Sequence, residues 1–235
     1  LNDGNYTLYI FTNDTAGNIN RTFNTAHSVT FVVDTTAPAS MQLYNLTERV
    51  NLSKNVPTFS FQGNDSWSSG LNCELSINSI MNTTGISAGN GTTVNQVAAR
   101  SLPDGNYNWS VRCNDSVRLG TTSVVRNFTV DTVVPAVISF DAPNSRQNFT
   151  TGETIVFNSS ISNVSGTATE VVIFELSNGT LRNFTASGTN ETSFNASLAV
   201  SGIQDGNHTL YVYARDTAGN INRTFGSAQS VIFVV

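Results

Sequence analysis

A four-residue motif, Asp-Gly-Asn followed by tyrosine or histidine, occurs three times in this chain of 235 residues. The copies begin at Asp3, Asp104 and Asp205, so each interval is 101 residues. A fixed period close to the size of one small domain is typical of a tandem array. The chain is therefore expected to fold as repeated units and not as one globule.

The copies agree beyond the motif. Residues 3–33 are nearly identical to residues 205–235, and both contain the stretch Asp-Thr-Ala-Gly-Asn-Ile-Asn-Arg-Thr-Phe. That stretch lies between two strand-like runs, so we expect it to form a hairpin connection. Asn178-Gly179 is a second hairpin signal, because both residues tolerate positive φ.

Two junctions divide the array. Strand-like apolar runs end in Asp-Thr-Thr-Ala-Pro at 34–38 and in Asp-Thr-Val-Val-Pro at 131–135, and proline ends ladder pairing. Residues 39–135 and 136–235 are then two complete units, and residues 1–38 are the C-terminal strands of an incomplete repeat. Because isolated hairpins are marginal in water, this piece either belongs to a longer protein or completes another subunit.

Alternation of apolar and polar residues predicts strands throughout. Trp109, Val111 and Cys113 alternate with Ser110 and Arg112, which is the period of a half-buried strand. No segment shows a convincing helical stripe. Units of about 100 residues built from short strands fit a β-sandwich.

The segment that leads into Tyr107 resembles the tyrosine corner of immunoglobulin-like and fibronectin-type folds, in which a tyrosine hydrogen-bonds back to the preceding turn. The expected fold class is all-β, with tandem immunoglobulin-like β-sandwich domains. In the last copy His208 replaces the tyrosine. We interpret it as a residue at the edge of the core whose tie to the turn is weaker.

The two cysteines, Cys73 and Cys113, each lie in a strand-like run. A disulfide across the sandwich would close a loop of about 40 residues and stabilise the fold by about 4 kcal/mol. One period later stand Phe174 and Ala214, a large and a small residue that suit two facing core positions. Two free buried thiols are the alternative. A disulfide indicates an oxidising compartment outside the cytosol.

The chain is also dense in Asn-X-Ser/Thr sequons, roughly three times as many as random placement would give. The excess favours N-glycosylation, although asparagine and threonine are also good turn and strand residues. On strand 107–113 we expect Asn108 and Asn114 to face outward, where a glycan can project. The potential acceptors are Asn5, Asn13, Asn20, Asn45, Asn51, Asn64, Asn82, Asn90, Asn108, Asn114, Asn127, Asn148, Asn158, Asn163, Asn178, Asn183, Asn190, Asn195, Asn207 and Asn222.

The composition limits the classes of partner that the chain could bind. Only 11% of residues are charged, and a carbohydrate coat would supply the solubility that surface charge usually gives. The formal net charge is −5, and no basic patch for nucleic acid exists. No apolar run is long enough to span a membrane.

The succession Asp-Gly-Asn-Tyr-Thr-Leu-Tyr, Asp-Thr-Ala-Gly-Asn and Phe-Val-Val-Asp-Thr-Thr-Ala-Pro resembles the immunoglobulin-like repeats of large bacterial and archaeal surface proteins and adhesins, with the archaeal type closest. The resemblance covers essentially the whole chain. It implies an extracellular, cell-surface stalk, filament or coat whose partners are identical subunits or further repeats. It also implies calcium at domain junctions in some members, here through Asp34, Asp131, Asp104 and Asp205, although an aspartate at those places is also a good turn former.

Catalysis is not expected. His27 and His208 fall at different positions of their repeats, and no Ser-His-Asp set, metal-ligand cluster or phosphate-binding loop converges. Gly17 and Gly219 belong to hairpin turns. An isopeptide bond is disfavoured because Lys54, the single lysine, lies in a polar turn-like stretch.

Two functions remain open. The first is a structural, N-glycosylated filament or surface-layer element, in which residues 1–38 possess the strands to complete a neighbour. The second is an adhesin that binds a partner or cell-surface glycans through an outward aromatic row. That row consists of Tyr9, Phe11, Tyr211 and Tyr213, alternating with inward Leu8, Ile10, Leu210 and Val212.

Overall fold

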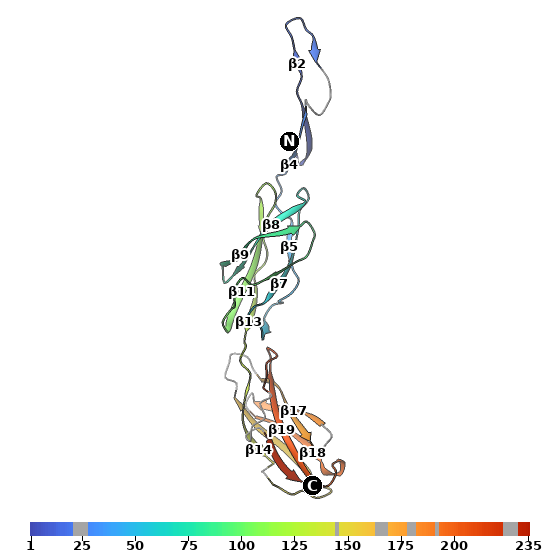
Figure 1. Ribbon diagram of the computed structural model, residues 1–235, viewed down its shortest axis with the longest axis vertical. Helices are drawn as coiled ribbons and strands as arrows, with labels where there is room; N and C mark the ends of the chain where they lie inside the picture. Colours follow the sequence, from blue (N-terminus) through green and yellow to red (C-terminus); the bar gives the residue numbers. More distant parts are fainter. Residues whose placement is uncertain (21–27, 144–145, 163–168, 178–181, 191–192, 223–229) are drawn as a thin grey trace. The chain divides into compact units, whose positions relative to one another are not determined.

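The computed structural model is built of strands (Figure 1), and the 3-10 turn Val200–Gly202 is the one helical element among the residues it describes. Those residues are 1–20, 28–143, 146–162, 169–177, 182–190, 193–222 and 230–235. The all-β, immunoglobulin-like fold class is confirmed. In this part of the chain no helix is long and apolar enough to cross a membrane.

The chain divides into two compact units. Their limits do not settle the boundaries expected from the sequence, so the division at 38 and 135 stays a prediction. The first unit comprises residues 1–47, 58–100 and 108–127, and the second comprises residues 48–57, 101–107 and 128–235.

The N-terminal hairpin is an antiparallel pair, β1 (Gly4–Tyr9) and β4 (Ser28–Val33), in which Gly4 lies opposite Val33. Between them, β2 (Thr12–Asn13) pairs with β3 (Ile19–Asn20) around the expected 14–18 turn. No second sheet covers β1 and β4 within the described residues.

The middle repeat contains two sheets. One has the order β10-β7-β5, and the other has the order β6-β13-β11-β8-β9, with β12 paired to β11. Phe59, Phe61, Leu75 and Trp109 are completely buried, and the rings of Phe59 and Trp109 lie 4.9 Å apart. The strands are β5 (Ser40–Leu43), β6 (Val50–Leu52), β7 (Thr58–Asn64), β8 (Gly70–Ile77), β9 (Ile80–Gly89), β10 (Val94–Val97), β11 (Gly105–Asn114), β12 (Gly120–Thr122) and β13 (Arg126–Val130).

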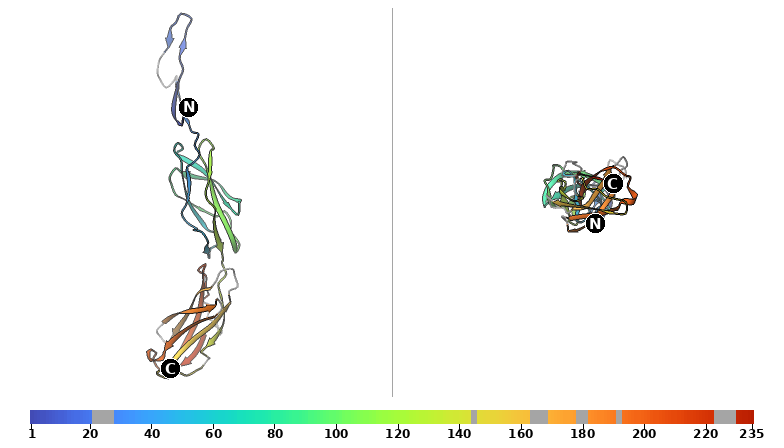
Figure 2. Two further views of the ribbon diagram at one scale, coloured as in Figure 1. Left: turned by 180° about the vertical axis from the view of Figure 1, so that it is seen from behind. Right: turned by 90° about the horizontal axis from the view of Figure 1, so that it is seen from below.

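The last repeat has one continuous ladder in the order β14-β15-β18-β17-β16-β19-β20, with β21 paired to β19. Figure 2 shows these strands side by side, coloured yellow to red. Ile155, Phe157, Leu210 and Phe233 form the centre of its core. The strands are β14 (Ala136–Ala142), β15 (Thr154–Ser162), β16 (Thr169–Ser177), β17 (Arg182–Asn190), β18 (Ser193–Ala199), β19 (Asn207–Asp216), β20 (Ile221–Asn222) and β21 (Ser230–Val234).

The cysteines form the expected disulfide, but within one sheet. Cys73 on β8 lies directly opposite Cys113 on the neighbouring antiparallel strand β11, with Cα atoms 4.0 Å apart. The expected bridge across the sandwich is therefore wrong, because alternation identifies a buried face and not the sheet to which a strand belongs. In the last repeat the register pairs Phe174 with Val212, and Ala214 with Val172, so the residues one period on do not face each other.

The tyrosine corner is present in all three copies. The hydroxyl groups of Tyr6 and Tyr107 donate to the backbone oxygens of Asn2 and Pro103, each over 2.7 Å. His208 Nε2 makes the same contact, also at 2.7 Å, with the oxygen of Gln204. The expectation of a weaker tie at His208 is not borne out, and its side chain is 1% exposed, well inside the core.

Candidate functional sites

Each repeat carries an aspartate that caps a tight loop, at Asp14, Asp115 and Asp216. In the last copy, Asp216 Oδ1 accepts the backbone N–H groups of Ala218 and Asn220, both at 2.9 Å. Its second oxygen, Oδ2, accepts the side-chain amide of Asn220 at 2.9 Å, and the same amide nitrogen donates to the backbone oxygen of Asp131 at 2.7 Å. One amide thus satisfies the carboxylate and ties the loop to the junction segment.

The first copy repeats the loop. Asp14 Oδ1 accepts the backbone N–H groups of Ala16 and Asn18 at 2.9 Å, and Oδ2 accepts the Asn18 side-chain amide at 2.8 Å. The Asn18 amide, followed by its backbone N–H, holds the pKa of the Asp14 carboxyl below its ordinary value.

The middle copy breaks the pattern at one atom. Asp115 Oδ1 accepts the backbone N–H groups of Val117 and Leu119 at 2.9 and 2.8 Å, as in the other loops. Leu119 stands where the other copies have Asn18 and Asn220, one period away. Without the amide, Asp115 Oδ2 is buried and has no hydrogen-bond partner.

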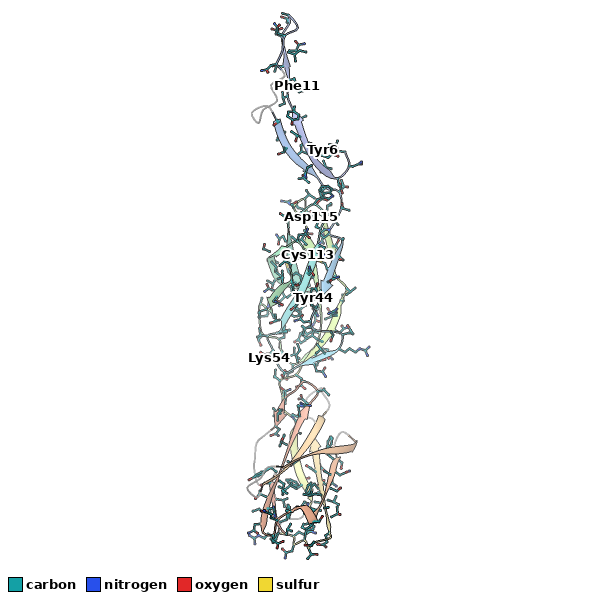
Figure 3. The ribbon with its side chains drawn as sticks, turned by 90° about the vertical axis from the view of Figure 1, so that its right-hand side faces the viewer. Tyr6, Phe11, Tyr44, Lys54, Cys113 and Asp115 are labelled. Atoms are coloured by element: carbon teal, nitrogen blue, oxygen red, sulfur yellow. A yellow bond between two sulfur atoms is a disulfide. The ribbon has the colours of Figure 1, made fainter. Side chains whose placement is uncertain are left out.

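Two further carboxylates face this orphan oxygen. Carboxylate oxygens of Asp34, Asp65 and Asp115 lie within 4.8 Å of one another. Asp34 Oδ2 is likewise buried without a partner. The Asp115 side chain is 6% exposed, and Figure 3 shows it just beyond Cys113, where β11 ends. We call these three residues the Asp115 cluster.

In all three residues of the cluster, Oδ1 is occupied by the local turn. Asp34 Oδ1 accepts the N–H of Thr36 at 3.1 Å, and Asp65 Oδ1 accepts the N–H groups of Trp67 and Ser68 at 2.8 and 2.7 Å. At Asp34 and Asp115 this leaves Oδ2, which is buried without a hydrogen-bond partner, next to the other carboxylates. Such an arrangement gathers negative charge, which is costly unless a cation or proton neutralises it.

Hydrogen bonds hold the three loops of the Asp115 cluster together. The hydroxyl groups of Ser68 and Ser116 lie 2.8 Å apart, which joins the 65–68 loop to the loop after Asp115. The Thr121 hydroxyl donates to the backbone oxygen of Pro38 at 2.6 Å, which joins β12 to the junction segment. The geometry is thus set by the sandwich and not by the carboxylates alone.

Only one of the four aspartates expected to hold calcium belongs to a group of potential ligands among the described residues. Asp34 belongs to the Asp115 cluster, whereas Asp104, Asp131 and Asp205 fall in no group of three potential ligands among the described residues. Instead, Asp104 accepts the N–H and hydroxyl of Thr132 at 3.0 and 2.9 Å. Sequence reasoning missed Asp65 and Asp115, although the leucine at position 119 was a visible departure from the repeat.

The aspartate of the opening motif therefore has a structural role. Asp3 likewise accepts the N–H and hydroxyl of Thr35, at 2.8 and 2.7 Å, and also the hydroxyl of Thr36. The Thr36 hydroxyl, followed by the Thr35 hydroxyl, holds the pKa of the Asp3 carboxyl below its ordinary value of 3.8. In the first two copies the motif thus joins its hairpin to the start of the following junction.

The sequons fall into groups by exposure. Among the acceptor asparagines whose side chains the structure describes, eight are half-buried, including Asn108 and Asn114, which we expected to face outward, and Asn114 Oδ1 is buried without a partner. Asn163 and Asn178 lie outside the described residues, as do His27 and the Asn178-Gly179 turn, and the side chains of Asn183 and Asn190 are likewise not described. The exposed acceptors are Asn5, Asn13, Asn20, Asn90, Asn127, Asn148, Asn195 and Asn207.

Several sequon amides are already engaged in the fold. The Asn45 amide donates to the backbone oxygen of Thr58 at 2.6 Å, while its oxygen accepts the N–H of Ser60 at 2.7 Å. Asn90 pairs in the same two-way manner with the backbone of Asp65. A glycan replaces one hydrogen of the amide that makes such bonds, so these asparagines are poorly placed as acceptors.

The outward aromatic row is only partly present. Tyr9 and Phe11 are 43% and 46% exposed, but the inward partners Leu8 and Ile10 are exposed as well. Tyr213 is 5% exposed and therefore buried, and Tyr211 is half-buried. The row does not recur as a surface feature of the last repeat.

Comparison with known proteins defines the fold. No family model matches the chain, and no curated protein matches it in sequence. Fibronectin(III)-like modules of Clostridium thermocellum CbhA are 17% identical, with a TM-score of 0.51 over 83% of this chain and 93% of theirs. A marsupial T cell receptor is 9% identical, with a TM-score of 0.53 over 83% of this chain and 73% of its own. A 1.5-MDa bacterial ice-binding adhesin matches at 18% identity and a TM-score of 0.41, over 95% and 70%, too loosely to define the fold.

Proposed function

We propose that the chain is a structural segment of an extracellular surface protein, an N-glycosylated filament, stalk or surface-layer element. The observation that carries this proposal is the recurrence of structural contacts: the corner contact occurs in all three repeats, and the aspartate–threonine tie occurs in the first two. The Asp3–Thr35 and Asp104–Thr132 ties recur at the period of the corner bonds. What recurs from repeat to repeat is structural contacts and not a reactive group, which favours a load-bearing array of repeats over an enzyme.

The disulfide and the low charge support the location. The Cys73–Cys113 bridge persists only in an oxidising compartment, and a glycan coat would protect exposed strand edges from pairing. Glycosylation is tested by secreting the chain from a host that N-glycosylates and by mapping glycopeptides with mass spectrometry. We expect high occupancy at the exposed acceptors Asn5, Asn13 and Asn207. Bare asparagines at all three would overturn the glycan coat.

The same measurement has an internal control. Asn45 and Asn90 carry sequons but use their amides within the fold, so their occupancy in folded, secreted protein should be much lower. Equal occupancy at these two positions would contradict the idea that the native contacts govern which sequons are used.

The hairpin offers a route to assembly. Leu8, Val29 and Phe31 are 54%, 53% and 40% exposed, whereas their counterparts two periods later are buried core residues. Burying one such side chain contributes about 1.5–3 kcal/mol. We propose that a complementary sheet covers this face, supplied by further residues of the polypeptide or by a second copy.

Light scattering after size exclusion separates the two sources. Assembly by a second copy predicts concentration-dependent oligomers that Phe31→Asn disperses, whereas the control Ile80→Asn, at an even more exposed site of the middle repeat, does not. A chain that stays monomeric at high concentration would rule out the second copy as the source. Electron microscopy of the native protein then shows whether ordered polymers form.

The second candidate function is an adhesin or glycan-binding module. The exposed rings of Tyr9 and Phe11 favour it, because exposed aromatic side chains stack on sugars. Binding to a glycan array that Tyr9→Ala and Phe11→Ala remove would support this function. Ordered polymers without such binding would support the structural function.

A further inference from the structure

We propose that different groups satisfy the second carboxylate oxygen of the loop-capping aspartate in the middle and last repeats. In the last repeat this group is the side-chain amide of Asn220, which donates to Asp216. In the middle repeat it is a divalent cation, calcium by its chemistry, bound by Asp34, Asp65 and Asp115. The residue at position 119 or 220 decides between them. This inference is independent of glycans and of assembly.

The loop caps at Asp115 and Asp216 share their backbone contacts and differ in one side chain, Leu119 in place of Asn220. In both, the aspartate accepts two backbone N–H groups on Oδ1, and its own N–H donates to the oxygen of residue 119 or 220 at 2.9 or 3.1 Å. The Asn220 amide then fills Oδ2 of Asp216 and reaches the junction at Asp131. Leu119 offers no donor, so the corresponding oxygen of Asp115 is left empty.

The surroundings of the unpartnered Asp115 Oδ2 are acidic and not apolar. Around Asp115 Oδ2 the middle repeat adds the carboxylates of Asp34 and Asp65, all within 4.8 Å. Leucine alone would leave one unsatisfied oxygen, but with Asp34 and Asp65 close by, three carboxylates lie together and require positive charge to balance them. In the last repeat, residues 163–168 (Asn-Val-Ser-Gly-Thr-Ala), which follow the strand corresponding to β7, contain no carboxylate. The acidic group and the missing amide therefore occur together, in the same cap.

The donor set favours calcium. Calcium binds carboxylate and carbonyl oxygens at about 2.3–2.6 Å, so two oxygens on opposite sides of one ion lie about 4.8 Å apart. Magnesium requires a tighter octahedron, with oxygens at about 2.0–2.1 Å. Softer metals prefer nitrogen or sulfur ligands, and this cluster offers only oxygen.

Cation binding would connect three segments of the first unit. Asp34 belongs to the junction that follows β4, Asp65 to the loop after β7, and Asp115 to the loop after β11. An ion held by all three fixes the junction to the sandwich, as Asn220 does between Asp216 and Asp131. The rigidity of this junction would then depend on the calcium concentration outside the cell.

Calcium binding is tested on the full chain after removal of metal with EDTA. Both tryptophans, Trp67 and Trp109, lie in the middle repeat, and the backbone N–H of Trp67 donates to Asp65 Oδ1. We expect one terbium ion per chain to luminesce by energy transfer from tryptophan, and calcium to displace it. We also expect calcium, and magnesium far less, to raise the unfolding temperature followed by tryptophan fluorescence. No saturable binding of calcium up to about 1 mM, the weak end for extracellular modules, would overturn the proposal.

Substitution at position 119 tests the exchange of the cation for an amide. Leu119→Asn should weaken calcium binding at least tenfold and raise the unfolding temperature in EDTA, because the amide supplies the missing donor. Asp115→Asn should abolish binding, whereas Asp104→Asn, which removes an equal charge outside the cluster, should not change it. In the converse variant, Asn220→Leu should lower the stability of the last repeat, and calcium should not restore it. Unchanged calcium affinity in Leu119→Asn, or equal losses in Asp115→Asn and Asp104→Asn, would refute the assignment.

Discussion

His208 donates from Nε2 to the backbone oxygen of Gln204 over 2.7 Å, while its ring stacks on Phe233 with centroids 5.4 Å apart. A carbonyl oxygen can only accept, so Nε2 holds the proton. Tyr107 makes the same pair of contacts, with Pro103 and with the ring of Phe128 at 5.5 Å. The corner therefore requires a planar ring with a donor at the right reach. The imidazole supplies that donor, but it leaves Nδ1 of His208 buried without a hydrogen-bond partner, which a phenol would not.

Removing only the donor measures this tie. Tyr107→Phe keeps the stacked ring and should lower the free energy of unfolding of the middle repeat by about 1 kcal/mol. Tryptophan fluorescence during urea denaturation reports on this repeat alone, because it contains both tryptophans. His208→Phe should cost a similar amount in the last repeat, and His208→Tyr should cost less. A neutral Tyr107→Phe variant would mean that stacking, and not the hydrogen bond, maintains the corner.

The sequence predicted well wherever the period carried the information. The corners at Tyr6 and Tyr107 and the turns at Asp14 and Asp216 follow directly from identical residues 101 or 202 positions apart. Alternation along β11 also predicted that Trp109 and Cys113 are buried.

What the sequence did not predict depends on which strands meet. Alternation shows that Cys73 and Cys113 point inward, but only strand pairing shows that they share a sheet. The Asp115 cluster is assembled from loops far apart in the chain, so spacing could not reveal it. Asn108 and Asn114 alternate with the buried Trp109, Val111 and Cys113 as expected, but both are half-buried, and their use as glycan acceptors stays a prediction.

Loss of the disulfide should destabilise the middle repeat selectively. Cys73 and Cys113 close a loop with a separation of 40 residues, for which chain entropy predicts about 4 kcal/mol. The double variant Cys73→Val, Cys113→Ala should lose stability of this order in urea denaturation followed by tryptophan fluorescence. The last repeat contains no cysteine, so its transition, followed by circular dichroism, is the control. Equal destabilisation of both repeats would contradict a local role.

The loop caps contain a second departure from the repeat. Gly17 and Gly219 adopt φ values of 86° and 91°, and Arg118 occupies the same position with φ 72°. A side chain in this left-handed region costs about 1–2 kcal/mol. A Cβ on Gly219 would meet nothing within 4 Å, so Gly219→Ala isolates the backbone cost.

We therefore expect opposite signs from two matched variants. Gly219→Ala should destabilise the last repeat by about 1 kcal/mol, whereas Arg118→Gly should leave the middle repeat unchanged or stabilise it slightly. Thermal unfolding, followed by circular dichroism for the first variant and by tryptophan fluorescence for the second, measures both effects. Destabilisation by Arg118→Gly would show that the arginine side chain makes a contact that outweighs the strain.

The base of the N-terminal hairpin should loosen in acid. The hydroxyl groups of Thr36 and Thr35 hold the pKa of the Asp3 carboxyl below 3.8. Because the pKa is lower in the folded state than in the unfolded state, this stabilisation is complete above the ordinary carboxyl pKa and is lost as the pH falls through the folded value. Carbon NMR of the Asp3 carboxyl should show a titration midpoint below 3.8, together with a change in the Thr35 amide signal. The double variant Thr35→Val, Thr36→Val should return the midpoint toward 3.8. An unchanged midpoint in that variant would remove the two hydroxyl groups as the cause.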